Sequence, residues 1–285
     1  MNTDLRYRLS QGGKNVVLFV FHVLMVGYVV LIFYPLFNMV VSSLKTTREI
    51  FQNPFGFPHL PQWKNFWIVW VEKGFYRYFG NSLWVTAVSM VFVLLFGSMA
   101  SYGLSRYSFR LSLLLYLLFL SGIMLPLKAA IIPLFILIKN LGLMDRHLSI
   151  ILIFIAMGLP STVFILSGFM KTVPKELEYA ARIDGCSDLS IYGRIVMPVS
   201  APAIALVTIY NAVPIWNDFF FPLVFIQSDR LKTLPVGLSS FFGQYSTNWS
   251  LLFSGLSIAI LPMLILYLFM SNYFIRGMTA GAVKG

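Results

Sequence analysis

Six long hydrophobic stretches, separated by polar segments, organise the chain. They run approximately over residues 16–41, 79–104, 111–138, 148–170, 201–226 and 251–275. Each is long enough for a helix that crosses a bilayer, which needs about 20 mostly apolar residues. The apolar residues follow one another without the alternating segments of about 10 residues that are typical of a transmembrane β-barrel. The pattern therefore predicts an all-α integral membrane protein with six transmembrane helices.

The polar segments predict how these spans are connected. Residues 42–78 form the longest segment, and its prolines exclude a long helix from its first half. We expect this segment to be an external loop, residues 79–275 to form a five-span core, and residues 276–285 to form a tail. All of these parts would belong to one domain over residues 1–285.

Composition agrees with this class of protein. Hydrophobic residues make up 58% of the chain and charged residues 11%, whereas a soluble domain has about 25% charged residues. The net charge of +11 comes from basic residues spread over short loops beside lipid head groups, and so does not indicate nucleic-acid binding. Arg6, Arg8 and Lys14 before the first span favour a cytoplasmic N-terminus. Six spans then place both termini, and the polar segment 171–199, in the cytoplasm.

The sequence contains no arrangement typical of catalysis or metal binding. The single cysteine, Cys186, excludes a disulfide within the chain. His22, His59 and His147 are too scattered to predict a metal site or a Ser–His–Asp arrangement. Residues 12–14 (Gly-Gly-Lys) lack the first glycine and the context of a phosphate-binding loop. We therefore expect no enzyme activity and no cofactor bound by this chain.

Residues 171–199, the coupling segment, carry the signals of a helix–turn–helix that is too polar to cross a membrane. Pro174 suits the first turn of a helix, and Gly185 suits its C-terminal end. Ser187 is a suitable cap for a second helix, which Pro198 would end. The spacing i, i+3, i+4, i+7 gives one shared face to Leu177, Ala180, Ala181 and Asp184. By spacing alone, this face either meets a partner protein or rests on lipid.

The coupling segment resembles the EAA signature of the membrane subunits of binding-protein-dependent ABC importers. That signature is Glu-Ala-Ala, three residues, Gly, nine residues, Ile, one residue, Leu-Pro. Here Ala180-Ala181 is followed at the same spacing by Gly185, Ile195 and Met197-Pro198. Tyr179 stands at the Glu position, so an acidic contact to the ATPase would have to come from Glu178 or Asp184. Cys186 stands where the family commonly has Ala, and Met197 stands where it has Leu.

Two further stretches resemble the carbohydrate-uptake branch of this family. One is residues 216–223 (WNDFFFPL), and the other is the tail at residues 276–285 (RGMTAGAVKG). The tail is similar to that of the smaller membrane subunit of maltose importers. The resemblance extends over nearly the whole chain and includes the order of the six spans.

This resemblance implies a type I ABC importer in a bacterial or archaeal cytoplasmic membrane. Its partners would be a second membrane permease subunit, two copies of a cytoplasmic ATPase that bind ATP and Mg²⁺, an external solute-binding protein and a carbohydrate. The segment between spans 4 and 5 would be the coupling helix, and the tail would also reach toward the ATPases. The residues that the resemblance assigns to ATPase coupling are Glu178, Tyr179, Ala180, Ala181, Asp184, Gly185, Ile195 and Pro198.

For the substrate path, a sugar requires aromatic faces and polar side chains, and an ionisable group at membrane depth is costly. The candidates are Asn211, Trp216, Asn217, Asp218 and Lys128. Two alternatives stay open for the charged residues. Asp218 either lines the path or caps or pairs with a neighbouring helix. Lys128 extends to the interface, pairs with Asp218 or lines the path.

The second external loop contains the candidates for contact with the binding protein, Phe241, Phe242, Gly243, Gln244 and Tyr245. In the maltose relative the matching loop reaches into the binding protein, whereas an ordinary docking loop would only touch it. Three other functions remain to be compared with a sugar permease. An ABC importer of a non-sugar solute fits the same signature. A self-sufficient secondary transporter would need internal repeats and more ionisable residues in its spans, and an intramembrane enzyme would need a catalytic pair.

Overall fold

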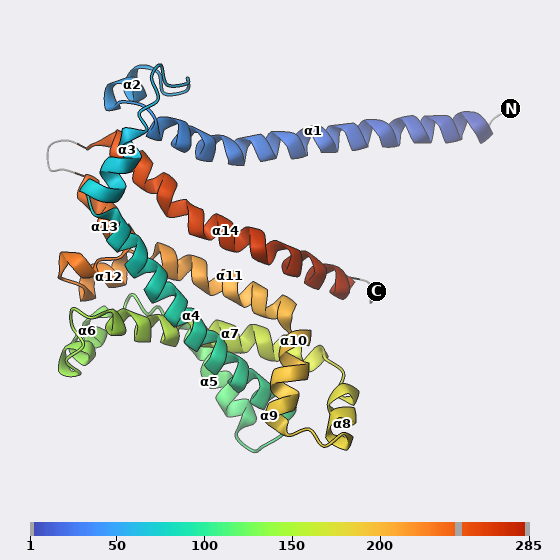
Figure 1. The fold of residues 1–285 in the computed structure, drawn as a ribbon. Coiled ribbons are helices and arrows are strands. Elements are labelled where there is room, and N and C mark those ends of the chain that lie inside the picture. Colours follow the sequence, from blue (N-terminus) through green and yellow to red (C-terminus); the bar gives the residue numbers. More distant parts are fainter. Residues whose placement is uncertain (1–2, 243–246, 283–285) are drawn as a thin grey trace. The chain divides into compact units, whose positions relative to one another are not determined.

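The computed structural model describes residues 3–242 and 247–282, and the surroundings of side chains in 17–242 and 247–271. Nearly all of this part of the chain is helical (Figure 1). Contacts between residues divide the chain into two compact units. The small unit comprises residues 1–73 and 241–258, and the large unit comprises residues 74–240 and 259–285.

The small unit contains the long first helix and the segment that follows it. Its helices are α1 (Thr3–Ser43), α2 (Thr47–Gln52), α3 (Lys64–Trp67), the π-helical turn η1 (Ile68–Glu72) and the first part of α14 (Trp249–Ala282). The Lys45 side chain is fully buried, and its ammonium donates to the Asn53 carbonyl at 2.8 Å, at the C-terminal end of α2. Positive charge is favourable at that end of a helix, so Lys45 holds the connection against α2.

The large unit contains the remaining helices. They are α4 (Phe75–Arg106), α5 (Ser112–Met124), α6 (Ile131–Asn140), α7 (His147–Thr172), α8 (Glu176–Ile183), α9 (Asp188–Ile191), the π-helical turn η2 (Tyr192–Val196), α10 (Met197–Val199), α11 (Ala201–Asn217), α12 (Phe220–Phe225), the 3₁₀ turn η3 (Asp229–Leu231), α13 (Leu234–Leu238), the 3₁₀ turn η4 (Ser239–Phe241), which ends in the small unit, and the rest of α14.

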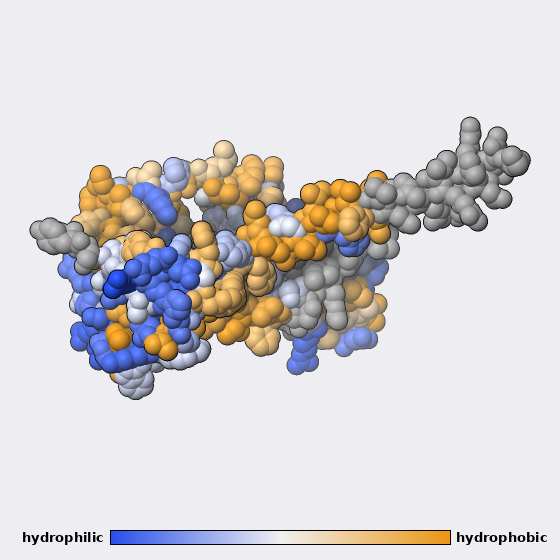
Figure 2. Space-filling model, turned by 90° about the horizontal axis from the view of Figure 1, so that it is seen from above, coloured by the Kyte–Doolittle hydropathy of each residue, from blue (hydrophilic) through white to orange (hydrophobic). Residues whose placement is uncertain are grey.

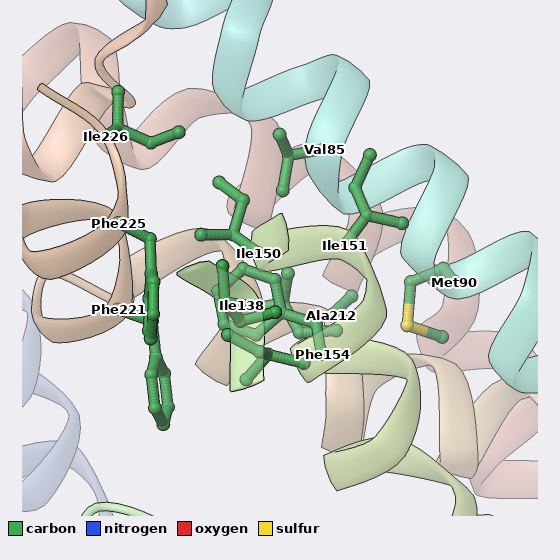
Figure 3. Close-up of a cluster of buried hydrophobic side chains, with 12 residues drawn as sticks. Val85, Met90, Ile138, Ile150, Ile151, Phe154, Ala212, Phe221, Phe225 and Ile226 are labelled. Carbon is green, nitrogen blue, oxygen red and sulfur yellow. The ribbon is translucent and has the colours of Figure 1, made fainter. Parts of the chain in front are cut away.

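The core of the large unit lies between α4, α7, α11 and α12. Figure 3 shows Val85 and Met90 of α4 in one buried cluster with Ile150, Phe154 and Phe221 of the neighbouring elements. Small residues let α4 and α7 approach closely, as is common between helices in membranes. A Cβ atom on Gly97 of α4 would lie 2.3 Å from the Thr162 side chain, and one on Gly158 of α7 would lie 2.8 Å from Val93.

Within the described residues, four helices are long and apolar enough to cross a membrane. They are Val17–Ser43, Phe75–Arg106, His147–Thr172 and Trp249–Ser271. Large apolar side chains cover much of the surface, as the orange areas of Figure 2 show. On α1, Leu31 is 71% exposed, which fits a helix that meets lipid or a partner rather than water.

The third span, expected over 111–138 with breaks at Pro126 and Pro133, is divided into two helices at Pro126, because α5 ends at Met124 and α6 begins at Ile131. The physical reason is Pro126, which lacks an N–H and forces Leu125 into an extended conformation with φ −79° and ψ 121°. The expected break at Pro133 is wrong, since this residue lies in the first turn of α6.

The fifth stretch, expected as one helix over 201–226, breaks at Asp218. That residue is extended (φ −70°, ψ 120°), and its Oδ1 accepts a hydrogen bond of 2.8 Å from the Phe221 amide in the first turn of α12. The carboxylate thereby replaces a backbone acceptor at the start of the second helix. The alternative in which Asp218 caps a helix is confirmed.

Candidate coupling segment and membrane cavity

The turn of the coupling segment has the geometry that its glycine predicts. Gly185 has φ 81°, and its amide donates to the Arg182 carbonyl at 3.1 Å. The Cys186 amide donates to the Ala181 carbonyl at 2.9 Å, which completes a Schellman motif at the end of α8. No atom lies within 4 Å of a Cβ built at this position. Backbone conformation, and not close packing, therefore requires glycine here.

The second arm also follows its local signals. The Ser187 hydroxyl accepts a hydrogen bond of 3.4 Å from the Ser190 amide, which confirms Ser187 as the cap of α9. The arm then continues through η2 to α10, where Pro198 is exposed and Ile195 is half-buried. A bend of 76° separates 188–199 from α11. Pro174 differs slightly from its prediction, since α8 begins two residues later, at Glu176.

Side chains of α8 divide between an inward and an outward face. Ala181 is buried in an apolar cluster with residues of α4, α7, η2 and α11. Leu177, Tyr179 and Ile183 are exposed, and Ile183 is 87% accessible. The face expected from the spacing is therefore split, since Leu177, Ala180 and Asp184 are exposed whereas Ala181 lies at its buried border. Apolar side chains that face outward on a polar segment are typical of a docking surface.

Glu178 points inward and forms an ion pair with Arg106, the last residue of α4. The two side chains are only 6% and 4% exposed. Arg106 also donates from Nη2 to the Val173 carbonyl at 3.1 Å. The candidate acidic contact to an ATPase from Glu178 is thus turned away from the surface. Sequence reasoning did not find Arg106, for which a basic residue at the end of a span was the only signal.

A second contact joins the end of α4 to the other arm. Desolvation by burial, together with the nearby Asp188 carboxylate, raises the pKa of the Tyr107 phenol. Arg182 Nη2 lies 2.8 Å from Asp188 Oδ1, which connects α8 to α9. An ion pair therefore spans the turn between the two arms.

A cavity of about 550 Å³ lies in the large unit between α7, α11 and the break that separates α5 from α6. Asn211, Asp218 and Lys128 line it, as do Tyr210 and Ser161. Lys128 Nζ lies 3.7 Å from Asp218 Oδ2, so the predicted pairing of these residues is confirmed. The Lys128 side chain is 62% exposed and that of Asp218 is 9% exposed. Two broken spans therefore meet at an ion pair on the cavity wall.

The structure places the other two path candidates away from the cavity lining. Trp216 is buried, and its Nε1–H donates to the Ala259 carbonyl of α14 at 3.0 Å. The Asn217 amide donates to the Val213 carbonyl one turn earlier at 2.9 Å. Tyr210 was missed by sequence reasoning, although it lines the cavity and the residue is 54% exposed. Helical periodicity alone could not place its side chain, because the facing helices were unknown.

Residues 93–280 match the family model described as "Binding-protein-dependent transport system inner membrane component". The chain belongs to this family. It is 39% identical to a putative ABC transporter permease protein of Caldicellulosiruptor sp., over 88% of this chain and 91% of the relative. It is 36% identical to an arabinooligosaccharides transport system permease protein of Halalkalibacterium halodurans, over 88% and 91%.

The fold also matches one chain in a solved crystal structure of a transporter. That chain belongs to a bacterial ABC transporter involved in the import of the acidic polysaccharide alginate. The TM-score is 0.80 at 22% identity, and the match covers 92% of this chain and 98% of the other. The likeness supports the overall fold described here.

Asn211 of this family member ties α7 to α11 through its side chain. Its Oδ1 accepts from the Ser161 hydroxyl at 3.1 Å, and its Nδ2 donates to the Thr162 hydroxyl at 3.2 Å and to the Val207 carbonyl at 3.0 Å. The amide is therefore committed to neighbouring helices, even though it borders the cavity. Of the other polar residues on the cavity wall, Tyr210 and Lys128 are the more exposed, whereas Asp218 is mostly buried.

The candidate binding-protein loop is only partly described. Phe241 is buried, and Phe242 is 56% exposed and forms an antiparallel bridge with Thr247. Gly243, Gln244 and Tyr245 lie outside the described residues. Among the residues searched for metal sites, which are those that the structure describes, no three His, Cys, Asp or Glu side chains come together.

Proposed function

We propose that the chain is the permease subunit of an ATP-driven ABC importer that forms part of the translocation path for a carbohydrate. The coupling segment carries this proposal. It has the spacing of the family signature, it folds as a helix–turn–helix with a left-handed glycine, and it keeps Leu177, Tyr179 and Ile183 on an exposed outer face. An apolar surface of this kind suits the groove of a partner ATPase.

The partners follow from what the chain lacks and from its family. ATP and Mg²⁺ would bind to two copies of a cytoplasmic ATPase, a second permease subunit would complete the path, and an external solute-binding protein would deliver the solute. Six spans, with α5–α6 as the third and α11–α12 as the fifth, would place both termini and the coupling segment in the cytoplasm. The tail, which continues as α14 to Ala282, would also lie there.

A carbohydrate is supported as the solute by the relatives and by the cavity. One relative is named for arabinooligosaccharides, and the transporter with the matching fold imports alginate. The half-exposed ring of Tyr210 offers a face for a sugar ring, and the Lys128–Asp218 pair offers a donor and an acceptor for hydroxyl groups. Few polar groups in a mainly apolar cavity is the usual composition of a small-molecule site.

Co-purification tests the proposal. A tagged chain, extracted from membranes of its native host in mild detergent, should bring with it an ATPase and a second multi-span protein. In proteoliposomes, a solute-loaded binding protein should stimulate ATP hydrolysis and sugar uptake. Solute uptake by the chain alone, without an ATPase, would instead establish a secondary transporter. A thermal-shift screen of the binding protein that stabilised only non-sugar solutes would overturn the carbohydrate assignment.

A further inference from the structure

We propose that Arg106 and Glu178 are positioning residues that fix the coupling segment to the end of α4, so that displacement of the segment moves α4. The inference rests on the proposed function and deepens it. Glu178 would then act inside the permease, and contact with the ATPase would be left to the exposed side chains of α8.

The burial of the pair is the first support. Both side chains are almost completely buried, and Arg106 also bonds the Val173 carbonyl in the connection between α7 and α8. Removing two opposite charges from water is costly, and here the attraction between the two charges offsets that cost. Because the pair is buried and not at the surface, its two residues fix the relative positions of the elements that carry them.

Further contacts connect α4 to the second arm of the segment. Ser98 Oγ and the Tyr192 hydroxyl lie 2.7 Å apart, and the Asp188 carboxylate of α9 lies near the Tyr107 phenol. The Tyr102 ring lies between them, with its centroid 5.4 Å from that of Tyr192 and 5.9 Å from that of Tyr107. The C-terminal part of α4 therefore contacts α8, α9 and η2, which are the three principal parts of the segment.

The order of the helices along the chain explains why these contacts of α4 matter. The segment continues directly from α7 and leads through α10 into α11, so both helices follow it through the backbone. Helix α4 is joined to it only through side chains, although α4 and α7 share the core of the large unit. A displacement that reached α7 and α11 but not α4 would shear that core, which is close-packed and resists small shifts. The Arg106–Glu178 pair prevents such shear.

Paired variants of the full reconstituted importer test the proposal. Arg106→Lys and Glu178→Asp keep both charges but change the reach and geometry of the pair. We expect each to lower the number of sugar molecules imported per ATP hydrolysed by about tenfold, which is within the range reported for residues that carry coupling. The double variant should lose little more than either single variant, because both break the same contact. Glu176→Gln, on the exposed side of α8, is the matched control and should leave the ratio unchanged.

The charge exchange Arg106→Glu with Glu178→Arg separates positioning from mere stabilisation. Restoration of the import ratio by the exchange supports the proposal. An assembled, equally heat-stable complex in which the single variants keep the wild-type ratio overturns it. Absence of an ATPase from the wild-type complex would instead refute the proposed function itself.

A distance measurement that leaves Arg106 and Glu178 unchanged tests the proposal even if the variants of these residues fail to assemble. Spin labels at Met99→Cys on α4 and Ile183→Cys on α8, in a Cys186→Ser background, report the distance between the two helices. We expect the same distance with and without ATP, since the segment and α4 move together. A distance that changes on ATP binding overturns the proposal.

Discussion

The two ends of α4 are held in different ways. At its C-terminal end, Arg106 and Glu178 form a single buried ion pair beneath the coupling segment. At its N-terminal end, Tyr78 donates to Asp229 at 2.9 Å and Asn81 donates to two carbonyls of the 226–234 loop, each at 2.9 Å. The first contact joins two buried charges, whereas the second belongs to a group of partly exposed hydrogen bonds.

The loop at the N-terminal end is also held by the connection between α6 and α7. Asp145 has φ 55°, and its carboxylate accepts hydrogen bonds from the Gln227 and Ser228 amides at 2.9 and 2.8 Å. His147 Nε2 lies 2.8 Å from the Leu231 carbonyl. Water can replace partly exposed hydrogen bonds between neutral donors and an accessible acceptor, but it cannot reach a buried charge. Substitutions should therefore be much more damaging at the coupling end of α4.

The largest effect on stability should come from truncating one member of the buried pair. Glu178→Ala or Arg106→Ala leaves the other charge buried without its partner, which costs about 3–5 kcal/mol. Thermal unfolding of the purified protein measures this loss. If either variant unfolded within a degree of the wild type, the two ends of α4 would be equivalent and the comparison would fail.

Gly185→Val should have the next largest effect. A non-glycine residue in the left-handed region costs about 1–2 kcal/mol, and a β-branched one costs more. The turn should deform, so that membrane insertion persists while transport-coupled ATP hydrolysis is lost. Gly193→Ala, at an exposed position of η2 with no positive φ, is the matched control. Coupled turnover that survived Gly185→Val would show that the turn does not set the position of α8.

A smaller loss is expected from Tyr78→Phe at the N-terminal end. The substitution removes one hydrogen bond, to a carboxylate whose side chain is 73% exposed, so it should cost about 1 kcal/mol. Thermal unfolding beside the Glu178→Ala variant gives the comparison directly. A loss equal to that of Glu178→Ala would indicate that the hydrogen bonds at the N-terminal end of α4 are as essential as the buried ion pair.

Acid should weaken the N-terminal end slightly. Hydrogen bonds from Ser228 lower the pKa of Asp145, and those from Lys232 and Tyr78 lower the pKa of Asp229. Because the folded pKa values lie below the unfolded value of about 3.9, the stabilisation is present above that pH and is lost as the pH falls through the folded pKa values. Unfolding temperatures measured from pH 7 to pH 3 should fall less in Asp145→Asn than in the wild type. Parallel curves would contradict this origin.

Local signals in the sequence predicted what local physics determines. Gly185 and Ser187 define the turn because φ and cap chemistry depend on neighbouring residues. The break at Pro126 was predictable from the proline itself, whereas the break at Asp218 was not, because it depends on a hydrogen bond from the Phe221 amide. The inward turn of Glu178 was not predictable, because its partner Arg106 is distant in sequence and the helix period does not say which face is covered.

Site-specific cross-linking tests the central claim, that the outer face of the coupling segment meets an ATPase. A photoreactive amino acid at Ile183, which is 87% exposed on α8, would be compared with one at Phe55, which is 75% exposed in the segment expected outside the cell. Both variants would be irradiated in membranes that contain the whole importer. The account predicts a cross-link to the ATPase subunit from position 183 and none from position 55. A cross-link from position 183 only to lipid or to an external protein would contradict it.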